Sequence, residues 1–227
     1  MGLGKKRDLL YGLQPDLAVV PECSRDTTRL CQDDGFETCW WGENKNKGLG
    51  VLARKPWTLE PGPAPRQKWI ASAWVRGPQE FLLIAVWACP VGTRREFNYV
   101  GQTYEALVRH PRWFAHGCPV VLCGDLNSNT SLDPGRKIRK HSAVVDLLVR
   151  KGLVSAYHTF FSEDHGAETR PTYYFWHRQE RQFHLDYIFL PCRWMERVTD
   201  VRVGAFTTWK RASDHMPLCV DLADPAA

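Results

Sequence analysis

The sequence predicts an α/β fold formed by one domain over residues 1–227. Short apolar runs of strand length, rich in Val, Ile and Leu, alternate along the chain with segments whose apolar residues recur at spacings of three and four. No repeat, low-complexity tract or linker divides the chain, and 44% hydrophobic with 24% charged residues is the composition of a globular protein. At 227 residues, the domain is long enough to bury a substantial core.

The first half of the chain is predicted to begin with a helix and continue mainly as strands. Three leucines lie on one face of a helix over residues 5–14, which ends before Pro15. A short buried strand over residues 16–21 then leads to Glu22. The other elements expected here are a helix at 24–32, strands at 36–42 and 48–54, an irregular proline-rich connection at 56–65, and a hairpin of strands at 69–76 and 80–87.

The second half is predicted to add two amphipathic helices and several short strands. The helices cover residues 94–108 and 142–151, and Gly152 suits the end of the second one. The strands are expected at 118–123, 153–157, 172–176, 183–190, 198–205 and 217–221.

Polar residues stand at the end of the most apolar strand in the middle of the chain. Four apolar residues at 120–123 are followed at once by Gly124, Asp125 and Asn127. In α/β sheets the carboxyl ends of strands are where chemistry is usually found. Asp and Asn after Gly are also good turn residues, so this motif alone leaves a turn and a site equally open.

A second acidic residue lies inside an apolar strand. Asp186 interrupts the run from Leu185 to Leu190, and a buried carboxylate is costly unless it has a partner. His215, next to Asp214, is the residue whose chemistry suits pairing with Asp186, because a catalytic imidazole usually has its second nitrogen fixed by a carboxylate or carbonyl.

Four motifs in a fixed order carry a resemblance to a known family. They read Pro-Asp-Leu-Ala-Val-Val-Pro-Glu at 15–22, Gly-Asp-Leu-Asn at 124–127, Leu-Asp-Tyr at 185–187 and Ser-Asp-His at 213–215. Over about residues 5–222, their order and spacing resemble the endonuclease/exonuclease/phosphatase superfamily, which includes exonuclease III, the AP endonucleases and DNase I. The resemblance implies a four-layer, DNase I-like α/β sandwich, in which two mixed, mostly antiparallel β-sheets pack face to face with helices outside.

The resemblance also implies a divalent-metal-dependent phosphodiester hydrolase. Mg²⁺ or Mn²⁺ is the expected cofactor, because a hard cation prefers carboxylate oxygens and neutralises charge on phosphorus. Glu22 matches the metal-binding Glu of the family, and Asp214 is expected to be a second metal ligand or an orienting group. A surface Glu after Pro21 is what the sequence alone would favour at position 22.

Four further residues receive catalytic roles from the resemblance. Asp186 would orient His215, which would either draw a proton from water or contact the scissile phosphate. Asp125 would position or deprotonate the attacking water, or protonate the leaving group. Asn127 would hold the water or a phosphate oxygen through its amide.

The expected substrate is nucleic acid, with DNA favoured over RNA. The net charge is +5, and a basic run follows the Asp125 strand by roughly a dozen residues, as suits a polyanionic substrate. Trp87 stands near a strand end where relatives contact phosphate, and Trp209 offers a surface on which a base could stack. The basic residues expected to contact the substrate are Arg136, Lys137, Arg139 and Lys140.

One feature departs from the family pattern. Members begin with a strand whose end carries an active-site Asn, whereas this sequence opens on the helix that should follow that strand. The departure implies an open sheet edge and one missing polar ligand, which puts full activity in doubt.

Two other functions remain open at this stage. One is a phosphatase or phospholipid phosphodiesterase of the same superfamily, although the Pro-Ala-Trp-Cys-Asp-Arg signature of inositol phosphatases is absent and residues 182–187 read Gln-Phe-His-Leu-Asp-Tyr. The other is a catalytically impaired nucleic-acid-binding domain. With no membrane-length apolar run and no export signal, the chain is expected to be a cytoplasmic monomer.

Overall fold

Two β-sheets pack face to face in this computed structural model, which describes residues 3–90, 99–133, 135 and 139–224. The larger sheet has six strands in the order β4-β5-β6-β7-β11-β8. Within it β6 and β7 run parallel and every other neighbouring pair is antiparallel. The strands are β4 (Thr58–Pro61), β5 (Ile70–Arg76), β6 (Phe81–Trp87), β7 (Val120–Asp125), β11 (Asp186–Pro191) and β8 (Leu153–Ser155).

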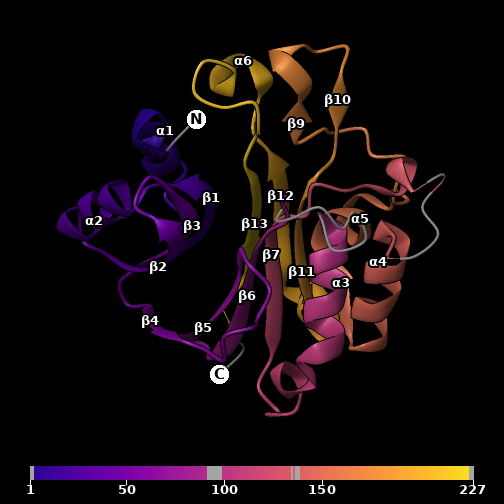
Figure 1. Ribbon diagram of the computed structural model, residues 1–227, viewed down its shortest axis with the longest axis horizontal. Coiled ribbons are helices and arrows are strands. Elements are labelled where there is room, and N and C mark those ends of the chain that lie inside the picture. Colours follow the sequence, from indigo (N-terminus) through magenta and orange to yellow (C-terminus); the bar gives the residue numbers. More distant parts are fainter. Residues whose placement is uncertain (1–2, 91–98, 134, 136–138, 225–227) are drawn as a thin grey trace.

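The opposing layer consists of a three-stranded sheet and a two-stranded ribbon. The sheet has the order β1-β3-β2, and β12 pairs with β13 in the ribbon. A further hairpin, β9 with β10, stands at the upper end of the molecule in Figure 1. These strands are β1 (Leu17–Cys23), β2 (Phe36–Asn44), β3 (Lys47–Arg54), β9 (Tyr173–Tyr174), β10 (Gln182–Phe183), β12 (Val198–Val203) and β13 (Leu218–Leu222).

Helices cover the outside of the sandwich. Figure 1 shows α3, α4 and α5 beside the larger sheet, α1 and α2 beside the three-stranded sheet, and α6 at the upper end. Among the residues described, no helix has the length and apolar character needed to cross a membrane. The helices are α1 (Arg7–Gly12), α2 (Arg25–Asp33), α3 (Val100–Arg109), α4 (His141–Arg150), α5 (Ala156–Phe161) and α6 (Phe206–Trp209), with short 3₁₀ turns at Leu3–Lys5, Pro111–Phe114, Thr130–Leu132, Phe175–His177 and Cys192–Arg197.

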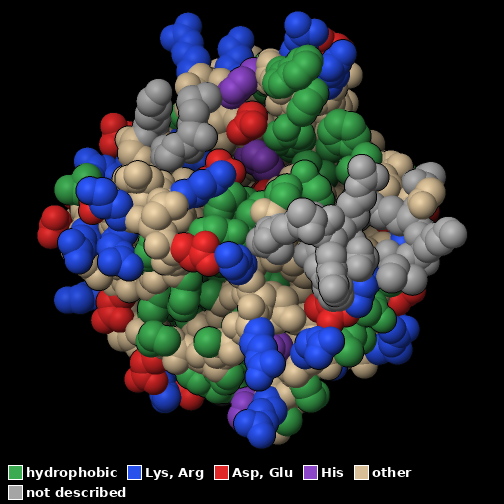
Figure 2. All heavy atoms as spheres, viewed as in Figure 1, with side chains coloured by type: hydrophobic (Ala, Val, Ile, Leu, Met, Phe, Trp, Pro, Cys, Tyr) green, Lys and Arg blue, Asp and Glu red, His purple; other side chains and the backbone are tan. Residues whose placement is uncertain are grey.

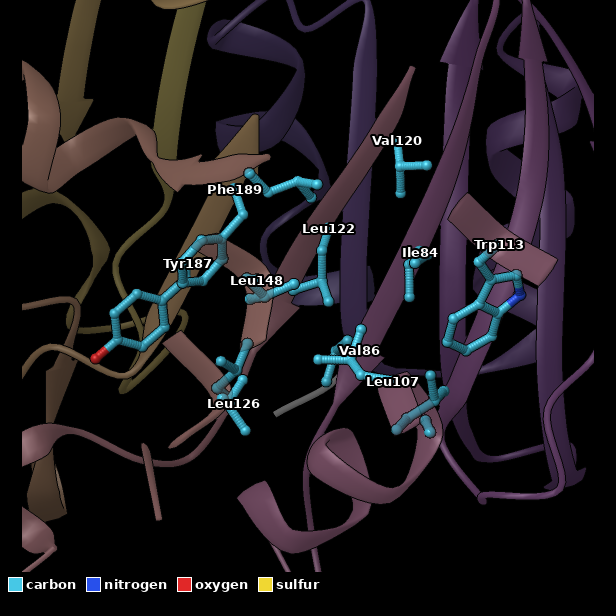
Figure 3. Close-up of a cluster of buried hydrophobic side chains, with 14 of the residues drawn as sticks. Ile84, Val86, Leu107, Trp113, Val120, Leu122, Leu126, Leu148, Tyr187 and Phe189 are labelled. Atoms are coloured by element: carbon cyan, nitrogen blue, oxygen red, sulfur yellow. The ribbon is translucent and has the colours of Figure 1, made fainter. Parts of the chain in front are cut away.

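The alternation of side chains along each strand divides the core into two layers. In β6, Leu82, Ile84 and Val86 face the helices, and the residues between them face the other sheet. Figure 3 shows the helix-side layer, where Ile84 and Leu122 of the sheet meet Leu148 and other side chains from the helices. Because both faces are apolar, β6 reads as a continuous hydrophobic run rather than an alternating one.

A groove separates β1 from β13. Within the described chain each of the two strands is paired along one edge, β1 with β3 and β13 with β12. Both strands line a groove of about 600 Å³, whose apolar wall includes Val19, Ile188 and Val220. The groove extends to Asp186 and His215. The open strand edges implied by the family resemblance therefore border an apolar groove that leads to these two polar residues.

Most predicted elements are present, but several differ in extent. The strand expected at 172–176 covers only Tyr173–Tyr174, and the one expected at 183–190 is divided between β10 and β11. A strand, β4, lies in the proline-rich segment expected to be irregular, because Thr58 to Pro61 pair with the edge of β5. The strand expected at 153–157 ends at Ser155, where the chain turns into α5 and the Ser155 hydroxyl bonds the His158 ring. The first residues of the helix expected at 94–108 lie outside the described residues.

Candidate active site

An acid and an imidazole from distant parts of the chain meet at one end of the sandwich. Asp186 is the first residue of β11, and His215 precedes β13 and forms an isolated bridge with Tyr173. The His215 Nδ1 donates to Asp186 Oδ2 at 2.8 Å. Both side chains are partly exposed, and Figure 2 shows histidine and acidic side chains gathered in the upper middle of the molecule. The structure therefore brings together the two residues predicted to pair.

Asp125 joins this pair because of strand register. Asp186 of β11 stands directly opposite Asp125 at the end of β7, and ligand atoms of Asp125, Asp186 and His215 lie within 4.8 Å of one another. Asp125 is 3% exposed. Its carboxylate accepts from the backbone N–H and the side-chain amide of Asn127, both at 2.7 Å. The amide of Asn127 thus holds the carboxylate in a fixed orientation.

The strand end around Asp125 depends on unusual backbone geometry. Gly124 has φ +138°, and a Cβ there would lie 2.0 Å from the Val86 carbonyl oxygen of the neighbouring strand, so only glycine fits. Asn127 and Glu22 have φ values of 46° and 56°, which place both in the left-handed region. Such backbone costs on the order of 1 kcal/mol or more, and it concentrates at functional sites.

The charges of this group change the pKa values of its members. Burial raises the pKa of Asp125 well above its ordinary value, with the Asp186 charge adding to the effect and His215 opposing it. Burial acts to lower the pKa of His215, but the charge and hydrogen bond of Asp186 outweigh it and raise the pKa to about 9. Without a bound cation, His215 therefore carries a positive charge at neutral pH.

Two predicted metal ligands lie near the group without belonging to its tight core. Glu22 Oε1 is 3.2 Å from Lys47 Nζ, and the Glu22 charge contributes to the raised pKa of Asp125. The charge of Asp214 contributes to the raised pKa of His215, and its backbone carbonyl accepts from Tyr174 N at 2.9 Å. Both carboxylates are thus within electrostatic reach of the same centre.

Two residues at this centre were not predicted from the sequence. Lys6 lines the groove beside Asp186 and His215; burial lowers its pKa, against the opposing charges of Asp186 and Asp214. The Tyr173 ring lies 4.6 Å from the His215 ring. The run of three basic residues at 5–7 could have drawn attention to Lys6, whereas nothing in the sequence distinguishes Tyr173.

The residues predicted to bind substrate through charge are only partly described. Arg136 and Lys137 lie outside the described residues. Arg139 points to α3, where its guanidinium is paired with the Glu105 carboxylate. Lys140 precedes the first residue of α4. The structure therefore gives Arg139 a partner within the fold rather than an open position for phosphate.

The two tryptophans expected to contact substrate are buried. Trp87 is 2% exposed and packs against Trp69 and beneath Lys47. Trp209 is 6% exposed and packs with Tyr174 and Met216. Neither indole presents a face on which a base could stack, because both are part of hydrophobic clusters. The interpretation of Trp87 and Trp209 as substrate contacts is therefore wrong for this conformation.

An exposed aromatic pair lies in the connection between β9 and β10, close in sequence to Tyr173, whose ring contacts that of His215. Two residues after Tyr173, the rings of Phe175 and Trp176 stack at 4.6 Å, and Trp176 is 65% exposed. The guanidinium groups of Arg178 and Arg181 lie 6.0 and 5.4 Å from the Trp176 ring. The sequence analysis predicted only a strand over 172–176, and nothing in the sequence favoured Trp176 over the other nine tryptophans.

His184 shows why strand parity alone is an unsafe guide. Along the strand expected at 183–190, alternation of side chains would place His184 on the same face as Asp186, near the site. In the structure β11 begins only at Asp186, and His184 is 2% exposed among Tyr157 and Tyr187 on the helix side of the sheet. The prediction is wrong because residues 184 and 185 do not continue the strand.

The donors at the site fit the divalent cation that the resemblance implies. Carboxylate oxygens dominate the group, as Mg²⁺ and Mn²⁺ prefer. Burial disfavours the charged form of Asp125 and raises its pKa, and a bound cation would offset that cost. Asp125, Asp186 and the nearby Glu22 and Asp214 could therefore hold such an ion.

The fold and the site together define a phosphoesterase built on a two-sheet α/β sandwich. The family model described as the Endonuclease/Exonuclease/phosphatase family matches residues 7–215, so the chain belongs to this family. No curated protein sequence matches the chain.

Solved structures with the same fold are nucleases and phosphatases. The 3′ phosphatase NExo (D146N) from Neisseria, bound to product DNA hairpin, matches with a TM-score of 0.72 and 19% identity, covering 98% of this chain and 96% of that chain. An AP endonuclease from Archaeoglobus fulgidus matches with a TM-score of 0.72 and 15% identity, covering 97% and 95%. The AP endonuclease LMAP from Leishmania major has a TM-score of 0.72 at 13% identity, covering 98% of this chain and 82% of its own. These likenesses establish the fold.

Proposed function

We propose that this chain is a divalent-metal-dependent phosphodiesterase that cleaves nucleic acid, with DNA as its substrate. The observation that carries the proposal is the hydrogen bond of 2.8 Å between His215 and Asp186, with Asp125 directly opposite Asp186 on the neighbouring strand. An oriented imidazole, a carboxyl group with raised pKa and several metal-binding oxygens are the groups that phosphodiester hydrolysis needs.

The imidazole has one nitrogen committed and one available. Because Nδ1–H donates to Asp186, Nε2 is the atom that meets substrate. In its neutral form Nε2 accepts a proton from the attacking water, and in its charged form it contacts a phosphate oxygen. Asp186 keeps the ring in one orientation for either role.

Asp125 would transfer a proton to the leaving group in this proposal. Burial favours its protonated form, which is the form that donates a proton to a leaving oxygen. The two N–H groups of Asn127 orient the carboxyl group at 2.7 Å, and the backbone one acts to lower its pKa against the effect of burial. After the transfer, the charge of His215 favours the carboxylate, and a bound cation would supply further positive charge.

Glu22 and Asp214 would hold the cation together with the carboxylate oxygens of the central group. When bound, a divalent cation supplies charge neutralisation at the phosphorus and helps to form the nucleophile. Lys47 Nζ, 3.2 Å from Glu22 Oε1, is a neighbour that the bound cation would share with this carboxylate.

The β9–β10 hairpin supports nucleic acid as the substrate. Trp176 offers an exposed indole face, and the side chains of Arg178 and Arg181 lie near it on the same hairpin. Aromatic faces combined with guanidinium groups bind unpaired bases and phosphates. The Neisseria relative of the same fold is bound to a DNA hairpin, which supports DNA rather than a lipid or a sugar phosphate.

The test is cleavage of labelled duplex, single-stranded and abasic oligonucleotides in Mg²⁺. We expect cleavage that EDTA abolishes and that His215→Ala reduces by on the order of 10³-fold, as expected for loss of an acid–base group. His116→Ala, which removes an exposed imidazole away from the site, is the matched control.

Three outcomes separate the alternatives. Release of phosphate from a lipid or sugar phosphate without cleavage of DNA or RNA would identify a phosphatase or phospholipid phosphodiesterase. Binding of DNA without cleavage in Mg²⁺ or Mn²⁺ would identify a nucleic-acid-binding domain. Cleavage of RNA alone would keep the chemistry but reject DNA as the substrate.

A further inference from the structure

A second group of titratable side chains lies on the opposite side of β11 from the candidate active site. Tyr187, which follows Asp186, points to the helix side, and in Figure 3 its hydroxyl extends away from the apolar cluster. Its ring lies within 6.0 Å of the rings of four histidines. The members of this group, called here the histidine cluster, are His141, His158, His165, Glu168 and His184.

The donor atoms of the histidine cluster converge. Ligand atoms of His158, His165 and Glu168 lie within 4.8 Å of one another. His158 Nε2 is 2.9 Å from Glu168 Oε1, and His141 Nε2 is 3.3 Å from His165 Nδ1. An ion with four bonds of about 2.0 Å in a tetrahedron separates its ligand atoms by about 3.3 Å. The donor atoms are therefore close enough to share one ion once a ring has turned.

Outer partners hold two of the rings with Nε2 directed inward. The Ser155 hydroxyl contacts His158 Nδ1 at 2.7 Å, and the Ser128 hydroxyl contacts His141 Nδ1 at 2.9 Å. A serine hydroxyl can accept a hydrogen bond from Nδ1–H, and for His141 this leaves a lone pair on Nε2. His158 Nε2 donates to Glu168 Oε1 at 2.9 Å, and an ion bound there would displace that proton. Hydrogen bonds of this kind on the far nitrogen are the rule for histidines that bind metals.

His184 supplies an independent observation. Its Nδ1–H donates to the Arg170 carbonyl at 2.9 Å, so its Nε2 carries a lone pair rather than a proton. The residue is 2% exposed, and Nε2 is buried without a hydrogen-bond partner. The His184 ring lies 5.7 Å from that of His158. A buried nitrogen lone pair without a donor is costly, and a bound ion or its water would satisfy it.

The cluster has the charge state that a transition metal needs. Burial lowers the pKa of His141 to about 4 and that of His165 to about 3, so both rings are neutral ligands at pH 7. Burial would raise the pKa of Glu168, but hydrogen bonds from His158 and the Gly166 N–H hold it at about 2. One negative charge is therefore surrounded by neutral nitrogen donors.

We propose that His158, His165 and Glu168 bind a divalent transition-metal ion, with His141 beside His165 as the fourth ligand. Imidazole nitrogens with one carboxylate suit Zn²⁺, whereas Mg²⁺ prefers oxygen donors and suits the carboxylates around Asp186. The two faces of β11 thus hold sites of different metal preference.

Binding requires one ring to turn. The rings of His158 and His165 stack at 3.5 Å with 16° between their planes, and one ion cannot lie in the plane of both. His165 is the ring that turns, because it lies in the turn before Gly166, whereas His158 is fixed in α5 by Ser155 and Glu168.

The site connects to the loop that carries Asp125 and Asn127. Glu168 Oε1 accepts from Asn129 Nδ2 at 2.9 Å, and Asn129 also contacts Tyr187. An ion held by Glu168 therefore fixes the connection after α5 against the loop after β7, and it stabilises the fold through residues that do not touch substrate.

The experiment compares Zn²⁺ and Co²⁺ binding to the metal-free full chain and its variants. We expect His165→Gln to weaken Zn²⁺ binding at the cluster by at least about 100-fold, since even outer-shell partners are worth roughly 10- to 100-fold. Glu168→Gln, which keeps the size of the side chain, should do the same. His116→Gln removes an exposed imidazole elsewhere and should leave binding unchanged.

Two measurements distinguish Zn²⁺ bound at the histidine cluster from Zn²⁺ bound at the candidate active site. One uses a variant of Asp186, and the other uses the unaltered chain. Asp186→Asn should retain tight Zn²⁺ binding and the visible absorption of tetrahedral Co²⁺. In the unaltered chain, Zn²⁺ should shift the imidazole NMR signals of His158 and His165. Equal Zn²⁺ affinity in the unaltered chain, His165→Gln and Glu168→Gln would overturn the proposal. Loss of tight binding in Asp186→Asn, with unchanged His158 and His165 signals, would overturn it as well.

Discussion

The two faces of β11 use the same kind of side chain in opposite ways. On the groove face, His215 is partly exposed and bonded to the Asp186 carboxylate. On the helix face, His141 and His165 are packed around Tyr187. The pKa of His215 is raised to about 9 by Asp186 against the effect of burial, whereas burial lowers the pKa of both helix-side rings.

The difference teaches what decides the charge of a buried imidazole in this fold. Burial pushes every one of these rings toward the neutral form. A carboxylate in direct contact with His215 reverses that tendency, so the groove face holds an imidazole able to carry a proton. On the helix face His141 and His165 are neutral, which suits binding of a transition metal, whereas the groove face suits acid–base chemistry beside a cation held by oxygen ligands.

The largest expected effect is a loss of kcat at Asp186 that its neighbour in β11, Tyr187, does not share. Asp186→Asn should lower kcat on a DNA oligonucleotide in Mg²⁺ by on the order of 10²- to 10⁴-fold, because His215 loses its orienting charge. Tyr187→Phe removes a hydroxyl that donates to the Ser128 and His184 carbonyls, so it should cost about 1–3 kcal/mol in urea unfolding with a far smaller change in kcat.

The comparison fails if the two variants behave alike. An unfolded Asp186→Asn would leave its kcat uninformative, so circular dichroism and the urea midpoint accompany each rate. Equal losses of kcat in two folded variants would mean that β11 acts as one structural unit, and Asp186 would then have no separate role in catalysis.

A smaller effect is expected on the hairpin that projects above the groove face. Trp176→Ala should weaken binding of single-stranded DNA by about tenfold, since stacking on one aromatic side chain is worth about 1–3 kcal/mol per base. Trp176→Phe should restore most of the affinity. Fluorescence anisotropy at a fixed salt concentration measures both, because the charge contribution changes with salt.

A matched control tests whether exposure alone explains the result. Val149 on α4 is 53% exposed and apolar, like Trp176, but it lies on the helix side of the molecule. Val149→Ala should leave DNA affinity unchanged. Equal weakening by Val149→Ala and Trp176→Ala would remove the hairpin from the proposed substrate-binding surface.

The sequence predicted the groove face better than the helix face, and the reason is physical. Asp186 and Asp125 stand out because a carboxylate at the end of an apolar strand is costly, and their order along the chain matches a family. The strands themselves are predictable because both faces of the larger sheet are apolar, and the family comparison and the related structures confirm the fold.

The helix face was not predictable, because its histidines come from four separate segments without regular spacing. His141 begins α4, His158 lies in α5, and His165 and His184 lie in connections. Only tertiary packing brings them together, and each one taken alone is an ordinary loop or helix-end histidine. Trp209 and Trp87 failed for the related reason that the sequence does not distinguish a buried indole from an exposed one.

The smallest expected effect is a pH dependence of opposite sign on the two faces. The folded pKa of His215, about 9, lies above the unfolded value of about 6.5, so its contribution to stability is complete below about pH 6.5 and is lost as pH rises through 9. The folded pKa of His165, about 3, lies below the unfolded value, so its contribution is lost as pH falls from about 6.5 toward 3.

Urea midpoints measured with EDTA across this pH range test both signs. His215→Asn should reduce the loss of stability at alkaline pH, and His165→Gln should reduce the loss of stability at acid pH. Because water screens the partly exposed His215 pair, the alkaline change should be modest. An alkaline fall that persists in His215→Asn would show that another group is responsible, and the contrast between the two faces would then rest on geometry alone.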